Sequence, residues 1–80
     1  MKKQYYIMIH RNFYGCKSTR SLERNLYGHV MWLPYKAAKE YIEYLNEHPY
    51  YLSHNEAGRP IYKIVGTDSM LGISLANSEW

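Results

Sequence analysis

The sequence has a single cysteine, Cys16, so an intramolecular disulfide is excluded and a structural zinc site has no pair of thiolates. Such a chain is typical of a reducing compartment. Long apolar runs are also missing. The apolar stretch at residues 5–9 is much shorter than a secretory signal, which needs roughly 7–15 apolar residues, or a membrane span, which needs about 20. We therefore expect a cytoplasmic protein that does not enter the membrane.

Strong charge of one sign is lacking as well, because ten Lys and Arg oppose seven Asp and Glu, a net +3 over 80 residues. The charge is unevenly placed, however. Residues 1–24 hold six basic and one acidic residue, or +5, and residues 25–80 hold four basic and six acidic residues, or −2. Such asymmetry steers an anionic partner, either a phosphate backbone or an acidic protein, toward one side of a molecule.

Motifs that carry chemistry are absent from the sequence. The four histidines are His10, His29, His48 and His54. No two of them flank a glutamate at the spacing of a zinc-binding helix. No motif places a base beside Cys16, and no glycine-rich loop with a lysine is available to hold phosphates. The sequence therefore predicts no metal, no cofactor and no catalytic residue.

What the chain does have is aromatic residues, with ten tyrosines and two tryptophans. A tyrosine buries a large ring but keeps a hydroxyl that needs a partner or water, so it suits half-wet surfaces. Tyrosine, tryptophan and arginine are enriched where proteins contact other macromolecules. The alternative is structural, because an 80-residue domain has a small interior and builds the edges of its core from amphipathic rings. Both interpretations stay open on the sequence alone.

The first third of the chain predicts two strands. Successive side chains of residues 5–10 would point to opposite faces of a strand, and both faces would be apolar or aromatic. This pattern is typical of a central strand. Residues 12–15 predict a turn, and the polar, basic residues 17–25 predict a loop. A second strand is expected over residues 26–32.

One helix is predicted in the middle of the chain. Pro34 suits the first helical position, where the missing amide proton has no partner in any case. Apolar residues then follow at helical spacing and form one stripe: Ala38, Tyr41, Ile42 and Leu45. Pro49 ends the helix, because the residue before a proline disfavours helical geometry.

Further strands are predicted over residues 50–54, 59–65 and 71–75, with a hairpin loop at residues 55–58. The expected fold class is α+β: a small antiparallel sheet of three to five strands, in the order β-β-α-β-β, with one amphipathic helix packed on one face. Residues 1–80 are expected to form a single domain.

The predicted function is non-enzymatic binding through an aromatic sheet face and a basic end. The aromatic candidates are Tyr5, Tyr6, Trp32 and Tyr62, and the basic candidates are Arg11, Lys17, Arg20 and Arg24. The expected partner is a larger protein or a ribonucleoprotein complex, and pairing with a second copy is compatible with the same surface. In size and composition the chain resembles small accessory proteins of phages and mobile elements, including anti-CRISPR proteins. That resemblance implies an inhibitor that occludes a site on a host defence complex in the host cytoplasm.

Two alternatives remain. An open aromatic sheet with basic residues at its rim suits the stacking of single-stranded nucleic acid. A histidine or tyrosine base with arginines and lysines suits a small ribonuclease. For this second alternative, residues 59–63 (Arg-Pro-Ile-Tyr-Lys) resemble the ligand-facing strands of small toxins from bacterial toxin–antitoxin pairs.

Overall fold

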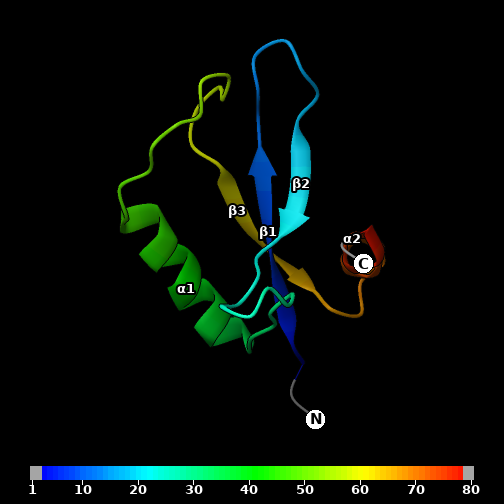
Figure 1. Cartoon of the computed structure of the whole chain (residues 1–80). Coiled ribbons are helices and arrows are strands. Elements are labelled where there is room, and N and C mark those ends of the chain that lie inside the picture. Colours follow the sequence, from blue (N-terminus) through cyan, green and yellow to red (C-terminus); the bar gives the residue numbers. More distant parts are fainter. Residues whose placement is uncertain (1–2, 79–80) are drawn as a thin grey trace.

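Three antiparallel strands and two helices make up the computed structural model, which describes residues 3–78 (Figure 1). In chain order the elements are β1 (Tyr5–Arg11), β2 (Thr19–Leu22), α1 (Tyr35–Glu47), β3 (Ile61–Gly66) and α2 (Met70–Ser78). The α+β class is therefore confirmed, but the order is β-β-α-β-α and not the predicted β-β-α-β-β. Neither helix of this part of the chain has the length and apolar character needed to cross a membrane.

Strand β1 lies at the centre of the sheet, whose strand order is β2-β1-β3, as its two apolar sides predicted. Three consecutive side chains of β1 are buried, and Ile7, Met8 and Ile9 are 1, 4 and 8 % exposed. Burial of such a side chain contributes about 1.5–3 kcal/mol, and β1 supplies three of the seven buried apolar residues of the described part of the chain. Helices lie on both sides of the sheet (Figure 1).

The strand register sorts the side chains of the sheet into two faces, because directly opposed residues point the same way. On the side that we call the α2 face, Met8 is paired with Leu22 of β2 and packs in one cluster with Val65 of β3. Leu75 and Ala76 of α2 pack against that cluster.

The other side of the sheet, which we call the α1 face, carries the alternate residues of β1. Tyr5 meets Tyr35 of α1 edge to face, with the ring centroids 5.4 Å apart. Helix α1 contacts both β1 and β3, and its Ala38 is fully buried. Burial raises the pKa of the Tyr41 hydroxyl of α1, and nearby groups that include Tyr62 of β3 add to the shift. Tyr62 is opposite Ile9 of β1 and therefore lies on the α1 face.

Helix α1 is confirmed close to its predicted bounds, with Pro34 as the residue before the helix and His48 as the residue after it. The first and last turns of any helix leave backbone groups without partners inside the helix. At the end of α1, Arg59 supplies donors: its Nη2 lies 3.2 Å from the carbonyl oxygen of Leu45 and 2.9 Å from that of His48. A cation at this end also matches the helix dipole.

The predicted strand over residues 26–32 is wrong, because this segment turns back on itself. The side-chain oxygen of Asn25 accepts hydrogen bonds from the backbone N–H of Tyr27, at 2.9 Å, and of His29, at 3.0 Å. Asparagine side chains that bond their own following backbone compete with sheet pairing. Gly28 completes the turn with a φ of 82°, a value that glycine adopts without strain.

The predicted loop over residues 17–25 contains a strand, β2, which pairs antiparallel with β1. Its only strongly apolar residue, Leu22, is 3 % exposed and anchors the strand in the core. Residues 50–54 were expected to be a strand but are irregular in the structure. Their polar groups bond to Glu56, as described below, and not to a neighbouring strand.

The predicted strand over residues 71–75 is also wrong, because these residues belong to α2. The Oγ of Ser69 accepts a hydrogen bond from the Gly72 N–H at 3.0 Å and donates one to the Gly66 carbonyl at 2.7 Å, so Ser69 caps the helix start. A Cβ at position 72 would overlap the carbonyl oxygen of Gly66. Glycine at position 72 therefore lets α2 pack directly on the end of β3.

Candidate partner-binding face

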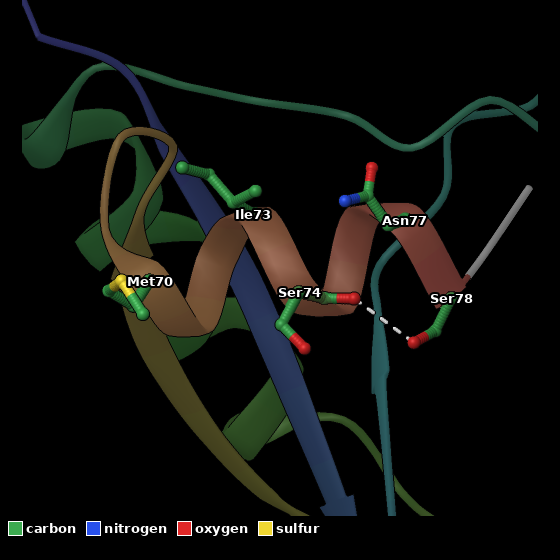
Figure 2. A pocket seen from close by; sticks show the side chains of 5 residues that line it. All are labelled: Met70, Ile73, Ser74, Asn77 and Ser78. Atoms are coloured by element: carbon green, nitrogen blue, oxygen red, sulfur yellow. Dashed lines mark hydrogen bonds between the residues drawn. The ribbon is translucent and has the colours of Figure 1, made fainter.

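Helix α2 presents an uncharged outer surface. None of its nine residues is charged, and Met70 and Ile73 are 88 % and 49 % exposed. Figure 2 shows the side chains that line a shallow hollow of about 480 Å³ on this surface, which are Met70, Ile73, Ser74, Asn77 and Ser78. The polar members are hydroxyl and amide groups, and the Ser78 hydroxyl already donates to the Ser74 carbonyl at 3.0 Å.

Trp32 lies at the same end of the α2 face and is 59 % exposed. It borders a hollow of about 250 Å³ together with Gln4, Tyr6 and Thr67. Thr67 belongs to the turn that leads into α2, and its hydroxyl donates to the Gln4 carbonyl at 3.2 Å. Trp32 and the turn that leads into α2 therefore flank one hollow. We call Tyr6, Trp32, Met70 and Ile73 the apolar end of the α2 face.

The other half of the α2 face carries positive charge. His10 pairs with Arg20 on β2 and with Ile61 on β3, and Lys63 is the partner of the neighbouring Met8. By the alternation of strand side chains, all of these residues point to the α2 face. Arg20, Ile61 and Lys63 are exposed. We call His10, Arg20 and Lys63 the basic strip.

No carboxylate interrupts the basic strip. The three strands and α2 contain no Asp or Glu. Within residues 3–78, neither Arg20 nor Lys63 forms an ion pair. Three of the acidic residues, Glu40, Glu43 and Glu47, belong to α1 on the opposite side of the sheet. The strands of the α2 face thus carry the basic strip, whereas α2 itself carries no charge.

The residues predicted as a single aromatic face are divided between the two sides of the sheet. Tyr6 and Trp32 lie on the α2 face. Tyr5 and Tyr62 lie on the α1 face, where both are half-buried. The predicted interface is therefore not one continuous aromatic surface.

The four basic candidates are separated in the same way. Arg20 lies on the α2 face, but Arg11 follows the alternation of β1 onto the α1 face. Arg24 donates from its Nη1 to the Gly28 carbonyl within its own turn. Lys17 is exposed in the loop between β1 and β2. Only Arg20 joins the basic strip.

Residues 59–63, which were considered as part of a ribonuclease site, do not bring their side chains together at one place. Arg59 bonds to the end of α1, and Tyr62 and Lys63 point to opposite faces of β3. The basic strip and the apolar end of the α2 face include four residues that were not among the candidates from the sequence: His10, Lys63, Met70 and Ile73. The absence of any acidic residue from 61–66 and 70–78 was the available signal for the last three.

A second polar cluster lies where two loops meet. Glu56 is 4 % exposed, and its carboxylate accepts hydrogen bonds from the Ser53 hydroxyl at 2.6 Å and the Tyr50 hydroxyl at 2.9 Å. These donors lower the pKa of Glu56, the Ser53 hydroxyl most, and burial raises the pKa of Tyr50. The same loop is tied to the β1–β2 loop, where the Ala57 N–H donates to the Asn12 carbonyl at 2.9 Å. The carboxylate is occupied by its own chain, so this cluster organises the loops.

Among the residues that the structure describes, no three His, Cys, Asp or Glu side chains lie close enough to hold a metal ion. Comparison of the chain with protein-family models, with characterised proteins and with solved structures found no match. Any functional assignment therefore depends on the α2 face itself.

Proposed function

We propose that this protein is a non-enzymatic binding protein whose α2 face covers a site on a larger protein or ribonucleoprotein complex. The uncharged, exposed surface of α2 carries the proposal, because soluble domains rarely leave an apolar helix face in water without a use for it. Met70 is a flexible, polarisable side chain of the kind that adapts to a partner's surface. Trp32 at the same end adds a large ring, the residue type that most often dominates binding energy at interfaces.

The composition of this surface supports binding without chemistry. The α2 hollow is lined by thioether, aliphatic, hydroxyl and amide groups, and by no imidazole or carboxylate. A serine hydroxyl needs an adjacent base to act as a nucleophile, and this hollow offers none to Ser74 or Ser78. The buried carboxylate of the chain, Glu56, is engaged by Tyr50 and Ser53 in a different region.

The proposal includes the inhibitory role implied by the resemblance to small phage and mobile-element proteins, namely occlusion of a site on a host defence complex. Expression of the chain in bacteria that carry an active defence system, such as CRISPR, tests it directly. Plating of a targeted phage should be restored by the unaltered protein. It should not be restored by Ile73→Glu, which places a charge in the centre of the α2 surface.

The matched control for this experiment is Asn46→Glu, which adds the same charge at an exposed position of α1. Both variants should keep the far-ultraviolet circular dichroism of the unaltered protein. Equal loss of protection with the two variants would contradict the assignment of the α2 surface. If Ile73→Glu merely converted a homodimer into a monomer on size exclusion, the surface would belong to self-association.

A further inference from the structure

We infer that the basic strip binds the phosphate backbone of a single-stranded nucleic acid. This inference goes beyond the proposed function, because the strip belongs to the three strands and contains no residue of α2. It depends on three observations: the placement of the cations across the sheet, the absence of nearby carboxylates, and the side chains of His10 and Ile61 beside the cations.

The two long cations stand on the two outer strands. Arg20 is on β2 and Lys63 is on β3, with β1 between them. Neighbouring strands are about 4.8 Å apart, and Arg20 is opposite His10 whereas Lys63 is opposite Met8, two residues further along β1. The two Cα positions are therefore roughly 12 Å apart, diagonally across the sheet. This separation lets the planar guanidinium and the compact ammonium contact different phosphates of one strand. A sheet of only three strands is a narrow platform, which suits one nucleic-acid strand better than a duplex.

The electrostatic field of the strip is not neutralised by its surroundings. Residues 5–22 contain Arg11, Lys17 and Arg20 and no acidic residue. Lys17 is exposed in the loop that joins β1 and β2 and adds to the positive charge of this part of the chain. Positive side chains without local partners release the counterions of a bound polyanion, which is the main source of affinity for phosphate backbones.

The side chains beside the cations favour a nucleic acid over an acidic protein. His10 and Ile61 are paired across β1 and β3, and Ile61 is 50 % exposed. An imidazole and an aliphatic side chain on an open sheet form a flat surface on which unpaired bases can pack. A protein partner needs a larger apolar centre than one isoleucine, and that centre lies at the apolar end of the α2 face.

The test is fluorescence anisotropy with the full chain and three short, mixed-sequence, fluorescein-labelled probes: single-stranded RNA, single-stranded DNA and duplex DNA. Binding is measured over a series of salt concentrations. We expect both single strands to bind and the logarithm of the association constant to fall linearly with the logarithm of the salt concentration. The double variant Arg20→Ala/Lys63→Ala removes two phosphate contacts. Its slope should be shallower by about 1.4, and binding at the lowest salt should weaken about tenfold or more.

The matched control is Lys36→Ala/Lys39→Ala, which removes the same net charge from exposed positions of α1. It should leave the slope unchanged, and Arg20→Lys should retain binding because it keeps the cation. The inference is overturned by absence of single-strand binding at the lowest salt, by tighter binding of the duplex, or by equal losses in the two double variants. Thermal melting of each variant separates loss of fold from loss of contact. Ile73→Ser, which disturbs α2 only, should leave the anisotropy unchanged, so the two proposals fail independently.

Discussion

The Oγ of Ser53 donates a hydrogen bond of 2.6 Å to the carboxylate of Glu56, a side chain that is only 4 % exposed. Glu56 also accepts a bond from the Ser53 N–H at 3.2 Å, so one residue supplies two of its donors. The two residues thereby close the irregular segment between α1 and β3. A carboxylate that is bonded in the folded state and free in the unfolded state links folding to pH.

The replacement Glu56→Gln should lower the midpoint of thermal unfolding. A glutamine has the same shape but no charge, so the bonds from Tyr50 and Ser53 lose their charge assistance. Its amide nitrogen also cannot accept the second bond of the Tyr50 hydroxyl. Circular dichroism at neutral pH measures the change. Glu47→Gln, at an exposed position of α1, is the control and should melt as the unaltered protein does.

Stability should decline in acid because the pKa of Glu56 is held below its ordinary value of 4.5, chiefly by the Ser53 hydroxyl bond. Between the folded and unfolded pKa values the unfolded chain binds more protons, so the contribution of Glu56 is fully present above pH 4.5 and is lost as the pH falls through the lowered pKa. Urea denaturation at a series of pH values measures this loss. The acid decline should be smaller in Glu56→Gln, and an identical decline in both proteins would assign the effect to other carboxyl groups.

The replacement Gly72→Ala should destabilise the fold despite the better helix propensity of alanine. Propensity favours alanine by roughly 1 kcal/mol, but the new methyl group would overlap the Gly66 carbonyl oxygen, a backbone atom of β3. Overpacking typically costs about 1–3 kcal/mol, with the upper part of that range expected where backbone must move. Chemical denaturation measures the difference. Asn77→Ala, at an exposed position of the same helix, gains propensity without a clash and should be neutral or stabilising.

The replacement Trp32→Ala should weaken partner binding by about 2 kcal/mol or more, which is roughly 30-fold in the dissociation constant. Its effect on the unfolding free energy should be small, because the side chain is 59 % exposed. Tyr27→Ala provides the comparison, since Tyr27 is 86 % exposed in the preceding turn and borders neither the α2 hollow nor the hollow at Tyr6. Equal losses of affinity in the two variants would place the contact away from the apolar end of the α2 face.

Local patterns predicted the elements that have a clear period or a strong boundary signal. The alternation of β1, the stripe of α1 between Pro34 and Pro49, and most of β3 are of this kind. Residues 71–75 are a short apolar run, which periodicity alone does not assign to strand or helix. Ser69 as a capping residue and the absence of β-branched residues other than Ile73 favour a helix there. The apolar residues at positions 71, 73 and 75 alternate as in a strand, and this alternation favours the wrong assignment.

The candidate site was harder to predict because it depends on strand register. A shift of one residue moves every side chain of a strand to the opposite face, so the sequence does not determine whether Tyr62 joins Tyr5 or Tyr6. The basic strip similarly brings together His10, Arg20 and Lys63, which are separated by 10 to 53 positions along the chain. Only the pairing of the three strands makes them neighbours.

The sheet has two outer edges, β2 and β3, and each carries one long cation, Arg20 on the first and Lys63 on the second. An unpaired strand edge is a template for fibril growth, and a charged side chain on it is a common natural safeguard. The same two cations therefore protect the protein from stacking edge to edge, and neutralising both exposes the sheet to that hazard.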